Sequence, residues 1–141
     1  MNVYFDTSAL VPLLIDEPTS SNCGELWDGA DNVICTRWGY VEAVAAIAMA
    51  ERLNRVSATE SANGRRVLDE LWPAIDIIEL RHELMIVASR LAVRHGLRGY
   101  DATHCAAALE ANDAYLVAAS GDKRLLAAWR TEGIAVRDIS E

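Results

Sequence analysis

The sequence predicts an α/β fold, in which a central, mainly parallel sheet of about five strands lies between two layers of helices. Short apolar runs alternate along the chain with longer segments whose apolar residues recur at helical spacing. The breaks between these segments carry glycine, proline or helix-capping residues. The chain has 141 residues with neither an internal repeat nor an interdomain linker, so we expect a single domain, residues 1–141.

Each element of this fold has its own signal in the sequence. Pro12 is expected inside or at a kink of the first helix, Ser57 and Glu60 form the capping-box pattern that opens a helix, and Pro73 ends that helix. The His-Gly pair at 95–96 is typical of a helix C-terminus. The expected strands are residues 2–6, 33–36, 75–80, 114–119 and 134–137. The expected helices are residues 7–15, 20–29, 37–53, 57 to 71 or 72, 81–95, 100–112 and 122–131.

Composition restricts the class of protein. A hydrophobic fraction of 52% with 24% charged residues describes a folded soluble domain, not a disordered chain. No basic segment precedes the apolar start, and the longest apolar run, residues 43–50, is far shorter than the roughly 20 residues of a spanning helix. We therefore expect a cytoplasmic protein without a signal peptide or membrane segment. The three cysteines form no Cys-x-x-Cys pair, which argues against a disulfide framework or a zinc ribbon.

Four acidic residues are the most informative feature of the sequence. Asp6 follows the first expected strand, and Asp122 follows the fourth. Glu42 lies about a turn and a half inside the helix after the second strand, and Asp101 opens an alanine-rich helix before the fourth. Functional groups of open parallel sheets gather outside the carboxyl ends of the strands. We expect the four acids to converge at that edge, where a divalent cation would neutralise their mutual repulsion.

A structural role competes with this interpretation. An Asp at a helix start accepts backbone N–H bonds, which by itself would account for Asp6, Asp101 or Asp122. Glu42 has no such role, because a carboxylate inside an apolar helix must be solvated, paired or bound to a metal. The four together favour Mg²⁺ or Mn²⁺, since hard oxygen ligands suit these ions, and phosphodiester hydrolysis is a reaction that such ions support.

Two hydroxyls lie next to these acids in sequence. Thr7 and Ser120 could orient a carboxylate or a water at the site, or could equally serve as turn or capping hydroxyls. The histidines form no ligand pattern, and His104 is expected to be a packed or partly exposed helix residue, which catalysis does not need if a metal activates the water. Four cations near the acids could contact phosphates, although solvation or ion pairing is their commoner role: Arg37, Arg98, Lys123 and Arg124.

The acids lie in segments that resemble the four acidic motifs of PIN-domain nucleases. These segments are Phe5-Asp6-Thr7-Ser8-Ala9-Leu10, Val41-Glu42-Ala43, Tyr100-Asp101-Ala102-Thr103-His104-Cys105-Ala106 and Ser120-Gly121-Asp122. They occur in order over essentially the whole chain, and the small size is similar to the VapC toxins of bacterial toxin–antitoxin modules. One departure is Ser120, where the family often has Thr, but the hydroxyl is retained.

The resemblance implies a three-layer α/β/α PIN-like fold and a Mg²⁺- or Mn²⁺-dependent endoribonuclease that hydrolyses RNA phosphodiester bonds. By motif position, Asp6, Glu42, Asp101 and Asp122 would be its metal-binding and catalytic residues. It also implies a homodimer and a cognate VapB-type antitoxin whose arm blocks the acidic site. The net charge of −8 fits a basic partner and argues against strong non-specific binding to nucleic acid. Apolar residues of helices 20–29 and 37–53 could supply the contact areas.

Three other functions share part of this pattern. A haloacid-dehalogenase-like phosphatase also has an Asp after its first strand, but its chemistry requires a second Asp two residues later, where this chain has Ser8. A phospho-accepting receiver domain has a similar size, but Glu42 would have no role in it. A catalytically silent PIN module that only binds a partner would retain the same motifs.

Overall fold

The computed structural model describes all 141 residues and contains one five-stranded sheet with the strand order β3-β2-β1-β4-β5. All four pairs of neighbouring strands are parallel. The strands are β1 Asn2–Phe5, β2 Asn32–Thr36, β3 Ile75–Ile78, β4 Leu116–Ser120 and β5 Val136–Asp138. The expected α/β class and the parallel sheet are confirmed.

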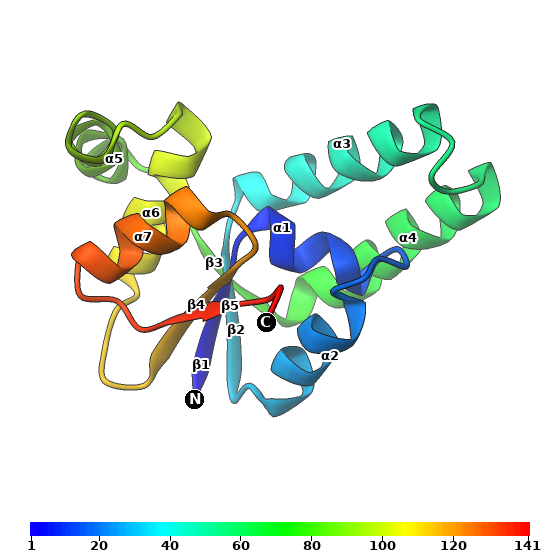
Figure 1. Ribbon diagram of the computed structural model, residues 1–141, viewed down its shortest axis with the longest axis horizontal. Coiled ribbons are helices and arrows are strands. Elements are labelled where there is room, and N and C mark those ends of the chain that lie inside the picture. The colour runs from blue at the N-terminus through cyan, green and yellow to red at the C-terminus, as the bar shows by residue number, and fades with distance from the viewer.

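Seven α-helices connect and cover the strands (Figure 1). They are α1 Thr7–Leu10, α2 Ser20–Gly29, α3 Trp38–Arg52, α4 Ala58–Leu71, α5 His82–His95, α6 Gly99–Glu110 and α7 Lys123–Thr131. The first expected helix is shorter than residues 7–15, because Pro12 lies in a 3₁₀ turn, Val11–Leu13, that follows α1. None of the helices combines the length and the apolar character that crossing a bilayer would require.

The capping box at the start of α4 and the glycine at the end of α5 are present, as the sequence predicts. The Ser57 hydroxyl accepts a bond from the Glu60 amide at 3.0 Å, and the Glu60 carboxylate accepts from the Ser57 amide at 3.4 Å, which completes the capping box of α4. Gly96 ends α5 in the left-handed conformation with φ 66°.

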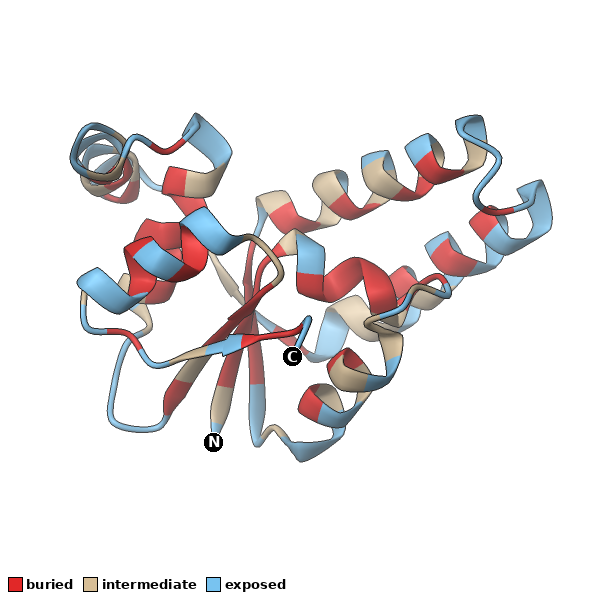
Figure 2. Cartoon of the chain, in the orientation of Figure 1, coloured by how far each residue is buried: buried red, intermediate tan, exposed pale blue.

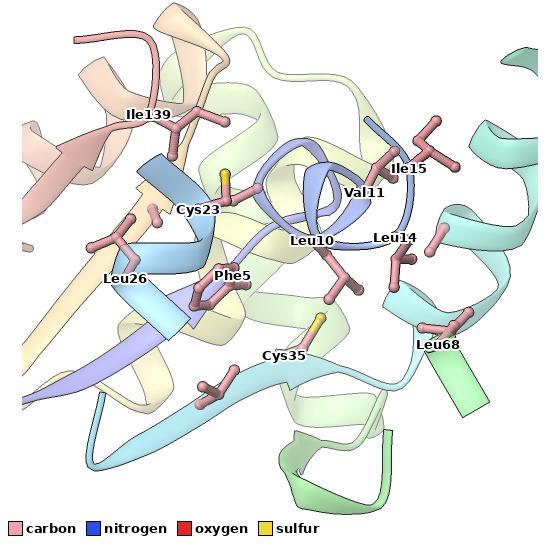
Figure 3. Packing of buried hydrophobic residues seen from close by; sticks show 14 of the residues in the cluster. Phe5, Leu10, Val11, Leu14, Ile15, Cys23, Leu26, Cys35, Leu68 and Ile139 are labelled. Carbon is pink, nitrogen blue, oxygen red and sulfur yellow. The ribbon is translucent and has the colours of Figure 1, made fainter. Parts of the chain in front are cut away.

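The hydrophobic core has two parts, one on each face of the sheet. Successive residues of β1 point to opposite faces, so Phe5 packs with residues of α1–α4 whereas Tyr4 packs with residues of α5–α7. Figure 2 shows the buried residues along the strands and on the helix sides that face them. Figure 3 shows the part around α1, where Leu10 and Cys35 are fully buried. The molecule therefore has three layers, α1–α4, the sheet, and α5–α7.

Close packing of α4 depends on a residue without a side chain. A Cβ atom at Gly64 would lie 2.9 Å from the Leu14 carbonyl oxygen and 3.0 Å from Cγ2 of Ile15. By contrast, a Cβ atom at Gly24 in α2 would have no neighbour within 4 Å. Gly64 thus lets α4 approach the chain that follows α1.

The strand order determines where a site can form. From β1 the chain moves to β2 and β3 on one side of the sheet, and β4 and β5 lie on the other side of β1. The connections of β1 and β4 therefore leave in opposite directions, which opens a crevice at the carboxyl ends of these two strands.

Candidate active site

All four acidic residues line one cavity of about 620 Å³. They reach it from four different elements: Asp6 follows β1, Glu42 lies in α3, Asp101 lies in the first turn of α6, and Asp122 is the N-cap of α7. Asp6 and Asp122 place the cavity at the carboxyl ends of β1 and β4. The four acids therefore meet at the sheet edge where the order of strands and helices in the sequence predicts them.

Asp6 is the most deeply buried of the four. Its Oδ1 accepts bonds from the Ser8 hydroxyl at 2.7 Å and the Ala9 amide at 3.1 Å, and its Oδ2 accepts one from the Ser120 hydroxyl at 2.6 Å. Burial raises the pKa of Asp6, and the hydroxyl bonds together with the nearby His104 only partly oppose this rise. A carboxylate has about four acceptor positions, so Asp6 has one left for another ligand.

Two serine hydroxyls join the ends of β1 and β4 at the site. Phe5 pairs with Ala119, so the residues that follow, Asp6 and Ser120, are neighbours. The Ser8 hydroxyl lies 3.3 Å from that of Ser120 and accepts a bond from the Gly121 amide at 2.8 Å. Ser8 and Ser120 thus link the two strand ends, and Ser120 also donates its hydroxyl to Asp6.

Asp122 combines a structural contact with a place in the cavity. Its Oδ1 accepts bonds from the amides of Arg124 and Leu125, at 2.8 and 3.1 Å, and so caps α7. No protein donor contacts its Oδ2. The capping and site interpretations are therefore compatible, because each uses a different oxygen.

Asp101 is partly shielded and is paired with a cation. Arg98 donates from Nε to Asp101 Oδ2 at 3.2 Å, and the guanidinium lies 4.8 Å from the centre of the Tyr100 ring. Burial is the main cause that raises the pKa of Asp101; Arg98 opposes the rise, and the charge of Asp122 adds to it. Asp101 and Asp122 therefore lie in the same cavity, and the negative charge of Asp122 disfavours ionisation of Asp101.

Glu42 contacts a histidine, although the histidines form no ligand pattern in the sequence. Its Oε1 lies 2.8 Å from Nε2 of His104, a buried residue of α6 that also lines the cavity. His104 is packed, as expected, but it also contacts an acid of the cavity, a contact that the sequence did not predict. Its spacing was the available signal, because His104 lies three residues after Asp101 and so on the same side of α6. The Thr7 hydroxyl contacts no acid and lies 3.4 Å from the same Nε2.

Most of the neighbouring cations are paired elsewhere. Arg37 pairs with Glu79, and Lys123 pairs with Asp138. The bond from Lys123, together with bonds from Ser140, lowers the pKa of Asp138 to about 2. Arg124 lines a different cavity, at the end of α5. Arg98 is thus the one candidate cation that lines the acidic cavity.

The donor set fits a hard divalent cation, although the side chains do not form a ready-made cage. No group of three or more His, Cys, Asp and Glu side chains is placed to hold one ion together. Three carboxylate oxygens in the cavity have no protein donor: Oε2 of Glu42, Oδ1 of Asp101 and Oδ2 of Asp122. Mg²⁺ usually takes one or two direct carboxylates and keeps several waters, a mode that these oxygens suit.

Comparison with known proteins identifies similar sequences and folds. The family model for the PIN domain matches residues 3–128. Ribonuclease VapC45 of Mycobacterium tuberculosis is 42% identical over 123 residues, which cover 87% of this chain and 85% of that protein. Two solved structures share the fold at low identity. FitAcB from Neisseria gonorrhoeae has a TM-score of 0.72, 15% identity and 99% coverage of both chains. VapBC2 from Rickettsia felis, bound to a DNA fragment from their promoter, has a TM-score of 0.64, 14% identity, and covers 97% of this chain and 98% of that one.

Proposed function

The chain belongs to the PIN-domain family, and we propose that it is a Mg²⁺- or Mn²⁺-dependent endoribonuclease toxin of the VapC type. The observation that carries this proposal is the single cavity lined by Asp6, Glu42, Asp101 and Asp122. Arg98 is the only arginine or lysine that lines this cavity, so these four acids have an excess of negative charge that a divalent ion would neutralise. The name of the 42% identical relative, a ribonuclease, supports RNA as the substrate.

The contacts of the protein's own groups support a role for each of them in the proposed reaction. Glu42, Asp101 and Asp122 would hold the ion with their free oxygens, directly or through water, and Asp6 with its remaining acceptor position. When bound, a divalent ion supplies the positive charge that lowers the pKa of an attacking water and offsets charge on the phosphate. Ser8 and Ser120 hold Asp6 in one orientation, which keeps the centre of the site fixed before RNA arrives. Arg98 can turn from Asp101 to an RNA phosphate, because its side chain is mostly exposed.

We further propose that a VapB-type antitoxin neutralises the enzyme in the cytoplasm and that the toxin forms a homodimer. Four exposed apolar residues lie four positions apart along α3 and its end: Val41, Ala45, Met49 and Leu53. They form one ridge of the helix, and Ala45 also lines the acidic cavity. A partner helix on this ridge would therefore lie beside the site. In contrast to the sequence-based suggestion for residues 20–29, α2 exposes no large apolar side chain.

The test is cleavage of RNA by the purified protein with Mn²⁺, with Mg²⁺ and with a chelator. We expect cleavage with either ion and none with the chelator. Asp6→Asn and Asp101→Asn should each lower the rate at least about 100-fold, because changes next to a metal ligand already cost about 10–100-fold. Asp76→Asn is the matched control, since Asp76 is an exposed carboxylate of β3 that does not line the cavity.

The outcomes separate the candidate functions. Phosphate release from a small monoester, with RNA left intact, would point to the phosphatase. Absence of any cleavage by a folded wild-type protein with either ion would support a binding module. Cleavage that survives both Asp6→Asn and the chelator would show that the acidic cavity is not the active site.

A further inference from the structure

His104 is the only histidine that lines the acidic cavity, and it is buried. It lies in the middle of α6, and its side chain is only 3% exposed. A buried imidazole needs a partner for each ring nitrogen, because an unpaired polar group costs free energy in the interior. The identity of these partners indicates what the residue does.

Both ring nitrogens are bound. Nδ1 lies 2.7 Å from the Tyr4 hydroxyl, and Nε2 lies 2.8 Å from Oε1 of Glu42. The Tyr4 ring packs edge-on against His104, with centroids 6.0 Å apart, and edge-on against Trp129, with centroids 5.8 Å apart. Tyr4 and Trp129 are fully buried, so the orientation of the imidazole is set by the core of the α5–α7 layer.

The direction of the bond to Glu42 follows from chemistry. A carboxylate can only accept, so the Nε2 proton of His104 is donated to Glu42 Oε1. If the ring is neutral, the Tyr4 hydroxyl donates to Nδ1. If the ring is charged, Nδ1 donates to Tyr4. The Nε2 proton faces Glu42 in both states, so the contact does not depend on the charge of the imidazole.

The contact uses one oxygen of Glu42 and leaves the other free. No protein donor contacts Oε2. Glu42 has no other hydrogen-bond partner, so without His104 its flexible side chain would have several rotamers available. Asp6 does not have this need, because Ser8, Ser120 and the Ala9 amide already fix it.

We propose that His104 is a positioning residue that holds Glu42 in the one orientation in which its second oxygen can bind the divalent cation. This inference rests on the proposed function. Hydrogen bonds connect Tyr4 to His104 and His104 to Glu42, the proposed ligand of the ion. Because Tyr4 is a buried residue of β1, these bonds fix the orientation of Glu42 relative to the sheet. His104 itself does not bind the ion or the substrate.

The test measures Mn²⁺ binding to the free protein by isothermal titration calorimetry, together with the Mn²⁺ concentration that gives half-maximal RNA cleavage. His104→Leu removes the donor and should raise both values about 10–100-fold, as expected for loss of a group that orients a ligand. His104→Gln can donate from its side-chain amide near the position of Nε2 and should restore most of the affinity. Saturating Mn²⁺ should recover most of the cleavage rate in both variants.

His95→Leu is the matched control. His95 contacts Glu132 at 3.0 Å and lies outside the acidic cavity, so this change should lower stability but leave Mn²⁺ affinity unchanged. A folded His104→Leu protein that binds Mn²⁺ like the wild type overturns the proposal. Equal losses in His104→Leu and His104→Gln also overturn it, because they would show that the imidazole itself is required.

A measurement on the wild-type protein covers the case in which His104→Leu fails to fold. Long-range ¹H–¹⁵N spectra should show a proton on Nε2 of His104, and its resonance should shift when Mg²⁺ is added. A ring protonated on Nδ1 alone overturns the proposal. If the wild type neither binds Mn²⁺ nor cleaves RNA, the proposed function fails as a whole. If the wild type does both and Asp6→Asn does not cleave, an unchanged His104→Leu refutes the role of His104 alone.

Discussion

Asp122 allows the structural and the functional roles of one carboxylate to be separated. Its Oδ1 caps α7 through two backbone amides, and its Oδ2 is free in the cavity. Asn caps a helix about as well as Asp, whereas Ala cannot cap at all. Asp122→Asn should therefore remove only the ion ligand, and Asp122→Ala should remove both the ligand and the cap.

The magnitudes follow from these contacts. Loss of an N-cap costs about 1 kcal/mol. Because α7 contributes the buried residues Leu125 and Trp129 to the core, this cost lowers the free energy of unfolding of the whole domain. For a domain of this size we expect Asp122→Ala to lower Tm by about 3–6 °C. Asp122→Asn should stay within about 2 °C of the wild type, because the loss of the charge–dipole interaction is small and the repulsion with Asp101 is relieved.

The assay combines thermal unfolding in a chelator with RNA cleavage in Mn²⁺. Both variants should lose at least about 100-fold in cleavage, although only one loses stability. If Asp122→Asn cleaves RNA like the wild type, Asp122 is a helix cap and not an ion ligand. If both variants lose the same stability, the assignment of the cap to Oδ1 is wrong.

Three further predictions concern stability. Gly64→Ala should destabilise the protein by about 1–2 kcal/mol in urea unfolding, because close packing outweighs the helix-propensity gain, whereas Gly24→Ala should stabilise it by about 0.5–1 kcal/mol. Asp138 has a pKa lowered to about 2, so its contribution to the free energy of unfolding is present above pH about 4 and is lost as the pH falls toward 2. Asp138→Asn should therefore cost about 1–2 kcal/mol at pH 6, a difference that shrinks in thermal melts below pH 4. Asp6 has a raised pKa, so the metal-free wild type loses stability as the pH rises through that pKa. Asp6→Asn should therefore have a Tm equal to or above that of the wild type at pH 8 in a chelator. A clearly lower Tm of Asp6→Asn would refute this prediction.

Much of the fold could be predicted because its signals are local. The capping box at Ser57, the glycine at 96 and the alternation of apolar runs each depend on a few neighbouring residues. The main errors are at element ends. The helix expected over residues 7–15 ends early because Pro12 cannot donate a backbone bond, and the strand expected over 75–80 stops at Ile78.

The site could be predicted only in part. The positions of the four acids follow from strand and helix order, which the sequence reveals. The partner of Glu42 does not, because His104 meets it across 62 residues of sequence. The sequence indicates only an ordinary member of an alanine-rich helix, and the contact with Glu42 follows from how the fold places α3 and α6. Likewise, the pairing of Lys123 with Asp138 could not be read from spacing alone.

The pairing of β1 with β4 determines when a newly made molecule can act. Asn2 lies beside Leu116, so the first strand must wait for a partner that is translated 114 residues later (116 − 2). At about 5–20 residues per second, this delay is on the order of ten seconds. Until then a nascent polypeptide has only part of its acidic pocket, because Asp122 follows β4. Under the proposed function, catalytic activity is therefore acquired only after Asp122 has been translated, and a product terminated before β4 should not cleave RNA.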